Sequence, residues 1–153
     1  MTFTLYGICP LLQVFDMPAS LRFYRDLLGF TVIDRAGEGD DVGWALLTLR
    51  GAELMLNTAY DTGERPAVPV PARVKAHDDT ALFFGCEHLE DLHAHLSAHG
   101  VDAVPPHRTG YGFRAVTLHD PDGYALCFHW PDTQANYDRW VERYGFPPRT
   151  VGR

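Results

Sequence analysis

The chain has 153 residues, 46% hydrophobic and 22% charged, and its 20 acidic residues against 13 Lys and Arg give a formal net charge of −7. This length suits one domain, or two small halves that share a core, and the composition is that of a globular protein rather than a disordered one. The acidic balance argues against a nucleic-acid binder, which would carry a basic patch. No apolar stretch reaches the ~20 residues of a membrane helix, so we expect no membrane partner.

The cysteines bear on the compartment. Cys9, Cys86 and Cys127 are odd in number, lie far apart and show no Cys-x-x-Cys spacing. This pattern favours reduced thiols over a disulfide framework or a structural zinc site. The first residues also lack the basic region and the cleavage-site pattern of a secretory signal. We therefore expect a cytoplasmic protein.

The first 58 residues predict a strand, a helix and three further strands. Branched and aromatic residues indicate a strand at 8–15. Pro18 suits the first turn of a helix, apolar side chains then follow at helical spacing as far as Leu28, and Gly29 suits the position after its end. The three further strands are expected at 30–34, 44–49 and 53–58.

The same order then returns after a proline-rich connector, residues 59–79, in which 72–76 predict a helical turn. Leu89, Leu92 and Leu96 stand at helical spacing and predict a second helix that stops before Gly100. The two halves align at an offset of 71 to 72 residues, which matches Asp16 with Glu87. Such a repeat of units, neither able to bury its own sheet face, predicts that the halves pair. The second set of strands is expected at 80–86, 101–104, 114–119 and 124–130.

This arrangement resembles the vicinal-oxygen-chelate superfamily, which includes glyoxalase I, extradiol dioxygenases and the bleomycin-resistance proteins. The resemblance covers roughly residues 6–131. It implies an α+β fold in which two paired βαβββ modules form a curved mixed sheet with a cleft, usually in a homodimer. It is carried by Val14-Phe-Asp16, by Leu21–Phe30 (LRFYRDLLGF) and by Asp120-Pro-Asp-Gly-Tyr124.

The resemblance gives a domain plan for the whole chain, residues 1–153. The first module is expected to span 1–58 and the second 80–131, with residues 59–79 between them. Residues 132–153 then form a C-terminal helix and tail.

Relatives that use a metal place His, Gln or Glu at four positions of the cleft. Matched to this chain, those positions hold Cys9, Met55, Thr80 and Cys127. Nickel, iron or zinc would need His and Glu there, and Mg²⁺ or Mn²⁺ would need oxygen ligands. We therefore expect no metal and no cofactor. Two alternatives stay open, namely a partial site rebuilt by Glu53 or His129, and a Cu(I) site made of the sulfur side chains.

Strand alternation predicts which side chains face the cleft. The expected face is mostly apolar with a few hydrogen-bonding groups, which is typical of a small-molecule pocket. The glycine-broken loop 107–114 is expected at its mouth, where Arg114 could pair with an anionic ligand. The expected ligand-binding residues are Cys9, Gln13, Met55, Asn57, Thr80, Phe84, Arg114, Cys127 and His129.

His129 is the candidate for acid–base chemistry, since an imidazole titrates near pH ~6.5. A histidine on a strand is more often a hydrogen-bonded structural residue, and a couple of Cys127 with His129 is a further alternative. Four other histidines, at 88, 93, 95 and 99, crowd the second helix and are expected to lie on its solvated face.

The tail predicts one more helix. Asp132-Thr133 can cap it, and aromatic side chains form a stripe along it as far as Tyr144. This stripe is too aromatic for a free surface, so we expect it to pack on the cleft edge or on a partner chain.

These observations favour a metal-free binding protein of the bleomycin-resistance kind over an enzyme, and the expected role is to sequester an antibiotic or an aromatic metabolite. The alternative is a glyoxalase-like or dioxygenase-like lyase or isomerase that uses His129 with Gln13 or Asn57, with or without a divalent metal. A third reading is a structural module whose cleft is closed.

Overall fold

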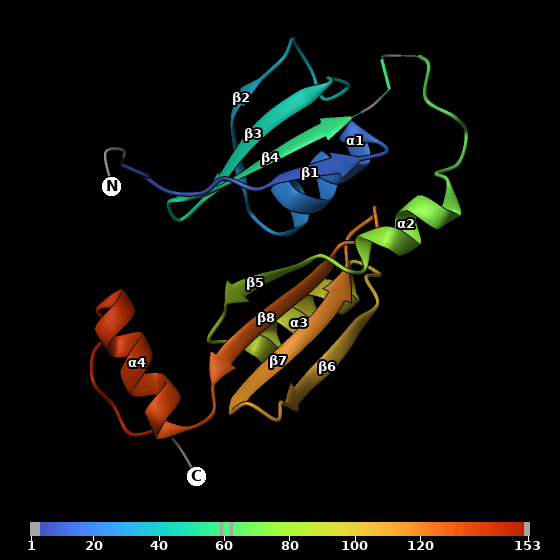
Figure 1. The fold of residues 1–153 in the computed structure, drawn as a ribbon. Helices are drawn as coiled ribbons and strands as arrows, with labels where there is room; N and C mark the ends of the chain where they lie inside the picture. The colour runs from blue at the N-terminus through green and yellow to red at the C-terminus, as the bar shows by residue number, and fades with distance from the viewer. Residues whose placement is uncertain (1–3, 59, 62, 152–153) are drawn as a thin grey trace. The chain divides into compact units, whose positions relative to one another are not determined.

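The computed structural model describes residues 4–58, 60–61 and 63–151. The chain divides into two compact units, Met1–Ala76 with Asp120–Gly123 and His77–His119 with Tyr124–Arg153. Each unit carries one four-stranded mixed sheet in the order β-α-β-β-β (Figure 1). The expected α+β fold of two βαβββ modules with a C-terminal helix is therefore confirmed. Among the described residues, no helix is long and apolar enough to cross a membrane.

In the first unit the strands lie in the order β1-β4-β3-β2, with β1 parallel to β4 and the other pairs antiparallel. A short α-helix, α1, continues directly into a π-helical segment, η1. A further helix, α2 (Pro71–His77), lies in the connector, where the sequence predicts a helical turn. The elements are β1 (Leu11–Val14), α1 (Met17–Leu21), η1 (Arg22–Leu27), β2 (Thr31–Arg35), β3 (Trp44–Leu49) and β4 (Ala52–Thr58).

Alternation along the strands separates a buried face from an open one. On the buried face Leu12, Leu47 and Leu56 are at most 3% exposed, and Met17 and Leu21 of α1 are fully buried. The neighbouring positions on the strands point to the other side, where side chains such as Leu11 are half-exposed. The helix therefore covers one face of the sheet and leaves the other face open.

The second unit repeats this plan with the strand order β5-β8-β7-β6. Its helix α3 lies behind β7 and β8 in Figure 1 and buries Leu89 and Leu96. The last helix, α4, contacts β8. The elements are β5 (Ala81–Gly85), α3 (Leu89–Ala98), β6 (Ala103–Arg108), β7 (Phe113–His119), β8 (Ala125–Pro131) and α4 (Gln134–Tyr144).

Strand β6 is longer than the sequence predicts, because it does not end at Pro105-Pro106. The pairing of β6 with β7 shifts register between Val104 and His107, so the two prolines lie in an irregularity of the strand. Proline lacks an N–H and is tolerated on an edge strand at such a bulge. The expected end at residue 104 was therefore wrong.

The helix of the first unit, α1 continued by η1, is one residue longer than α3, the helix of the second unit. The π-helical segment η1 accounts for this extra residue. Asp16 caps α1 and His88 occupies the cap position of α3, an offset of 72, whereas Gly29 and Gly100 after the helices are offset by 71. In η1 the N–H of Leu28 donates to the carbonyl of Phe23, five residues earlier, so the turn holds one extra residue. Asp16 therefore corresponds to His88 rather than to Glu87.

The turn Asp120–Gly123 joins β7 to β8 of the second unit but belongs to the first. Asp120 and Asp122 are 5% and 3% exposed. Tyr24 donates its hydroxyl to Asp120 at 2.7 Å, while Ser20 and the backbone N–H of Phe15 donate to Asp122 at 3.1 and 2.6 Å. Buried carboxylates are stable only when their oxygens accept such bonds, so this turn has a specific docked conformation.

Gly123 is the residue of this turn that is least able to change. Its φ is +90°, and a Cβ there would lie 2.4 Å from the carbonyl oxygen of Val74. We expect Gly123→Ala to lower the free energy of unfolding by about 2–3 kcal/mol, measured by urea denaturation. Gly110→Ala is the control, since nothing lies within 4 Å of its added Cβ, and equal effects of the two variants would contradict the docked turn.

Candidate functional site

The open face of the second sheet carries a pocket of about 570 Å³. Apolar side chains from β5, β6 and β8 form most of its wall, and Tyr111 comes from the loop between β6 and β7. Its polar groups come from one carboxylate, one imidazole, a phenol, a hydroxyl and a thiol. The lining residues are Ala81, Phe83, Asp102, Ala103, Val104, Pro105, Tyr111, Thr117, Leu118, His119, Ala125, Leu126 and Cys127.

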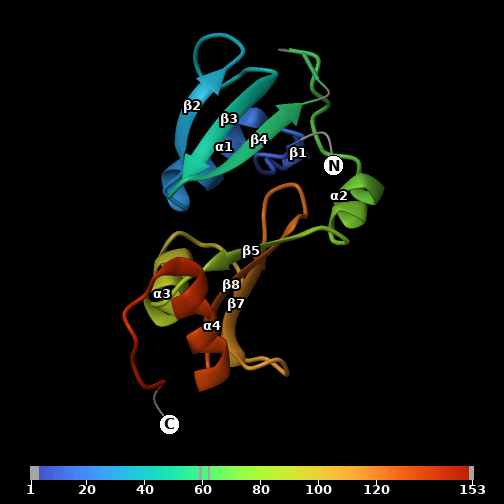
Figure 2. The ribbon, with the colours of Figure 1, turned by 60° about the vertical axis from the view of Figure 1, so that its left-hand side comes forward.

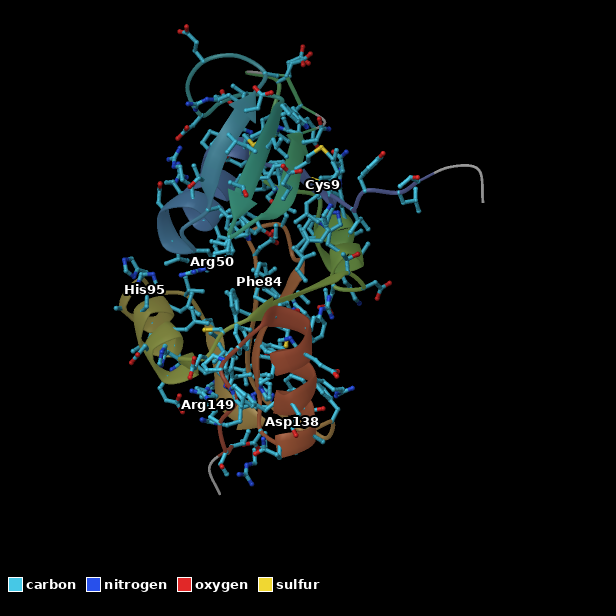
Figure 3. The ribbon with its side chains drawn as sticks, turned by 90° about the vertical axis from the view of Figure 1, so that its left-hand side faces the viewer. Cys9, Arg50, Phe84, His95, Asp138 and Arg149 are labelled. Atoms are coloured by element: carbon cyan, nitrogen blue, oxygen red, sulfur yellow. The ribbon has the colours of Figure 1, made fainter. Side chains whose placement is uncertain are left out.

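Phe83, and not Phe84, shares this face with Cys127. In the parallel pairing of β5 with β8, Phe83 lies opposite Cys127 and Phe84 lies opposite Phe128. Phe84 stacks on Phe128 with ring centroids 4.8 Å apart, on the face that α3 covers (Figure 3). The expectation that Phe84 faces the cleft was therefore wrong by one residue.

The same shift applies to Thr80. Leu11 pairs with Met55 and Phe83 pairs with Cys127, so corresponding positions on β1 and β5 differ by 72 residues. The position that corresponds to Cys9 is therefore Ala81 rather than Thr80. Thr80 is exposed and lies before β5, where its carbonyl accepts a bond from the N–H of Ala125.

Arg114 does not lie on the open face. It pairs with Trp130 across β7 and β8, and its guanidinium forms an ion pair with Glu90 of α3. That pairing holds the pKa of the Glu90 carboxyl below its usual range. The expectation that Arg114 stands at the cleft mouth to meet an anion was therefore wrong.

Cys127 lies at the base of the pocket and is 7% exposed. Burial raises the pKa of its thiol, while the neighbouring phenol of Tyr111 acts more weakly in the opposite direction. Burial likewise raises the pKa of Tyr111. Both groups are therefore neutral near pH 7, and Cys127 is a packed thiol rather than an activated nucleophile.

The C-terminal helix α4 occupies the other end of the open face (Figure 2). The ring of Trp140 lies against Gly85, where a Cβ would be 3.3 Å from it, and its centroid is 5.6 Å from that of Phe113. Thr133 caps the helix by accepting a bond from the N–H of Asn136. The tail helix therefore packs on the open face of its own unit's sheet, where the sequence predicts a contact with the cleft edge or with a partner chain.

Asn136, at the start of α4, holds the loop that carries Tyr111. Its side-chain amide donates to the carbonyls of Tyr111 and Gly112 at 3.0 and 2.8 Å, and Asn136 itself is 6% exposed. Gly112 has φ +81° and a Cβ there would lie 2.7 Å from the amide nitrogen of Asn136. The helix thereby fixes the loop that places the phenol beside Cys127.

His129 is enclosed by aromatic rings. It stacks on Phe113 with centroids 4.7 Å apart, and the rings of Trp140 and Phe83 approach it at 5.3 and 5.4 Å. Its buried Nδ1 has no hydrogen-bond partner among the described residues, and burial lowers its pKa. A general base needs an orienting partner, and the buried Nδ1 of this imidazole has none among the described residues.

The first unit carries the other four candidate residues. The amide of Asn57 donates to the side-chain oxygen of Gln13 at 3.2 Å, and these residues face each other on β4 and β1. Met55 is half-buried beside Leu11, and Cys9 is half-buried just before β1. The structure thus joins Gln13 and Asn57 in one polar pair on the open face of the first sheet.

The residues present do not fit the metal that the fold family implies. With the corrected register, the four ligand positions hold Cys9, Met55, Ala81 and Cys127, so one has no donor atom and none has an imidazole or a carboxylate. Nickel, zinc, iron or manganese in such a site would need nitrogen and oxygen ligands. No three His, Cys, Asp or Glu side chains within the described ranges lie close enough together to hold a metal.

Sequence reasoning missed Tyr111, Asn136 and Trp140 as residues that shape the pocket. The glycines on both sides of Tyr111 indicated a loop at the cleft, but nothing local showed that its phenol reaches Cys127. Asn136 and Trp140 lie one turn apart on the aromatic helix, and only the packing of α4 shows which face they meet.

Comparison with known proteins places this geometry in context. A family model described as the glyoxalase/bleomycin resistance protein/dioxygenase superfamily matches residues 8–128. A bleomycin-binding protein complexed with bleomycin is 18% identical, with 82% of this chain and 98% of that chain covered and a TM-score of 0.59. Lactoylglutathione lyase from Agrobacterium tumefaciens is 18% identical, with 82% and 94% covered and a TM-score of 0.61.

A virulence protein from Salmonella typhimurium is 19% identical, with 83% of this chain and 98% of that chain covered and a TM-score of 0.58. At these identities the likeness shows the fold alone. A search of curated protein sequences found no match.

The contact of Trp140 predicts a large cost for its removal. We expect Trp140→Ala to lower the free energy of unfolding by about 2–4 kcal/mol, because the rings of Phe113 and His129 lose the surface that covers them. Urea denaturation measures this change. The exposed Glu142 on the same helix gives the control Glu142→Ala, expected within ~0.5 kcal/mol of the unaltered chain. A Trp140→Ala chain as stable as that control would refute the docking.

His129 makes stability depend on pH. The folded chain holds it neutral with a lowered pKa, whereas the unfolded chain takes up the proton near pH ~6.5. The stability that neutral His129 contributes is therefore fully present above pH ~6.5. It is lost as the pH falls from there toward the lower pKa of His129 in the folded chain. We expect the free energy of unfolding to fall less in His129→Gln than in the unaltered chain when the pH is lowered from 7.5 to 5.5. Urea denaturation at each pH measures this change. His88→Gln, at an exposed position, should keep the original pH dependence, and the same loss in both variants would disprove the assignment.

Proposed function

The chain belongs to the glyoxalase/bleomycin resistance protein/dioxygenase superfamily, and on this premise we propose that it is a small-molecule-binding protein that works without a catalytic metal. The observation that carries the proposal is the pocket on the open face of the second unit, with the neutral Cys127 and Tyr111 pair at its base. Its volume is within the range of small-molecule sites, and its apolar walls with few polar groups have the composition of such sites.

The lining indicates the chemistry of the ligand. The pocket contains one carboxylate, Asp102, and one imidazole, His119, and no Lys or Arg is among its lining residues. Phe83 and Tyr111 are 58% and 56% exposed, so their rings are available to stack on a flat ligand. A neutral or positively charged molecule with an aromatic body fits this lining better than an anion does. Its polar atoms would meet the hydroxyl groups of Tyr111 and Thr117.

The metal-free part of the proposal rests on the donor atoms. Ala81 replaces a ligand outright, and the buried thiol of Cys127 is held protonated, whereas a thiol must lose its proton to bind a metal. The bleomycin-binding protein among the structural neighbours supports a role in sequestering an antibiotic or an aromatic metabolite.

The second candidate is a lyase, which the fold shared with the lactoylglutathione lyase suggests. It would need His129 as the acid or base together with Gln13 or Asn57. The aromatic rings around His129 and the bond between Gln13 and Asn57 favour packing over catalysis at both places. Lactoylglutathione lyase activity that appears with added Ni²⁺ or Zn²⁺ and is lost in His129→Gln would favour this candidate instead.

We further propose that the chain works as a homodimer in the cytoplasm and that residues 1–153 act as one domain. The three described cysteines are free, which suits a reducing compartment. Light scattering on the eluted peak of a gel-filtration column measures the mass directly.

Two adjacent phenylalanines give a matched test of the pocket. Phe83→Ala removes a wall of the pocket and should weaken ligand binding about tenfold, while Phe84→Leu alters the opposite face and should change stability but not affinity. Quenching of the fluorescence of Trp130 and Trp140 measures binding, with bleomycin and a panel of neutral, cationic and anionic aromatic compounds as probes. Binding unaffected by Phe83→Ala, or weakened equally by both variants, would overturn the assignment of the site. If no probe binds, the proposed ligand class is wrong.

A further inference from the structure

The end of α3 carries two histidines whose rings face each other. His95 and His99 lie one helical turn apart, both are exposed, and their ring centroids are 4.4 Å apart (Figure 3, which labels His95). Two imidazoles at this spacing can direct nitrogen atoms to a common point about 2.0–2.1 Å from each, the distance for zinc, and similar distances serve related metals. We propose that this pair binds a divalent transition-metal ion.

A second observation shows that one ring is already oriented as a metal ligand. The Nδ1 atom of His99 lies 2.8 Å from the backbone carbonyl oxygen of His95. A carbonyl only accepts, so Nδ1 carries the proton and the lone pair is on Nε2. Histidines that bind metals are typically held in this way, with the other ring nitrogen donating to a carbonyl or carboxylate. The fold thus fixes the tautomer before any ion arrives.

The charges around the pair favour a cation. His95 is in the last turn of α3 and His99 follows that helix directly, so both lie at the negative end of the helix dipole, which favours positive charge. Asp91 precedes His95 by one further turn, which places a carboxylate on the same stripe of the helix. His88 lies seven residues before His95, and His93 lies two residues before it. Neither is one helical turn from His95 or His99, so neither is expected to contribute.

The ligand set decides which ion is preferred. Imidazole suits copper, nickel and zinc, and affinity for such ligands is greatest for Cu²⁺, whereas Mg²⁺ prefers oxygen ligands. The chain supplies two ligands and water completes the shell, since the described residues place no third His, Cys, Asp or Glu within reach. The site lies on the outer surface of α3, whereas the pocket lies on the opposite face of the sheet. The proposed metal site is therefore independent of the proposed ligand pocket.

Isothermal titration calorimetry of the full chain with CuCl₂, NiCl₂ and ZnCl₂ tests the proposal, with MgCl₂ as the hard-ion control. We expect one ion per chain, bound most tightly for Cu²⁺, with no heat from Mg²⁺. Loss of a residue that only supports a ligand costs ~10–100-fold in affinity, so His95→Ala and His99→Ala should each weaken binding at least ~10-fold. His93→Ala, on the same helix, should bind as the unaltered chain does.

Protons compete with the ion for Nε2, so binding should also weaken as the pH is lowered from 7.5 to 5.5. Because both side chains are exposed, the variants should keep the circular dichroism and unfolding midpoint of the unaltered chain. Absence of one-to-one binding, or binding that survives in both His95→Ala and His99→Ala, would overturn the proposal.

Discussion

The hydrogen bonds from Asn136 to the loop that carries Tyr111 are the interaction on which the candidate site depends. A buried side-chain amide that donates to two adjacent carbonyls ties the loop to the start of α4, and the carbonyl of Gly112 also accepts a bond from the N–H of Asp132. The loop in turn holds the phenol of Tyr111 beside the thiol of Cys127. The helix outside the repeated modules thereby shapes the pocket inside one of them.

The repeat explains why the two open faces differ. Gln13 and Asn57 face each other in the first unit, and Gly85 and His129 occupy the corresponding positions in the second. The first pair forms a side-chain hydrogen bond. At the second pair the absence of a side chain on Gly85 leaves room for the ring of Trp140, which closes over His129. The same pair of strand positions is thus a polar pair in the first unit and lies under an aromatic ring in the second.

Much of this fold could be predicted from the sequence, because local signals determine it. The capping Asp16, the glycines after the helices and the alternation of β3 and β4 each report their own surroundings. The register of β5 could not be predicted in this way. A π-helical turn in the first half shifts the helix ends by one residue, so alignment by the helices and by the strands gave offsets of 71 and 72. A shift of one residue reverses the face of a strand, so the sequence predicts Phe84 on the open face where the structure has Phe83.

The site was harder to predict, since its members meet only through tertiary packing. Of the residues expected to bind a ligand, Cys127 alone lines the pocket, and alternation along β8 predicts its face. Arg114 was expected from the loop before β7 rather than from alternation, and its pairing with Trp130 and its ion pair with Glu90 show that it lies on the face covered by α3.

The central claim is that α4, through Asn136, builds the pocket around Cys127. The most direct measurement is the rate at which iodoacetamide alkylates Cys127 in the native chain, followed by mass spectrometry of the peptide that contains it. We expect slow alkylation in the unaltered chain and in Asp138→Asn, a change at an exposed position of α4 (Figure 3), and faster alkylation in Asn136→Ala. Equal rates in all three chains would contradict it.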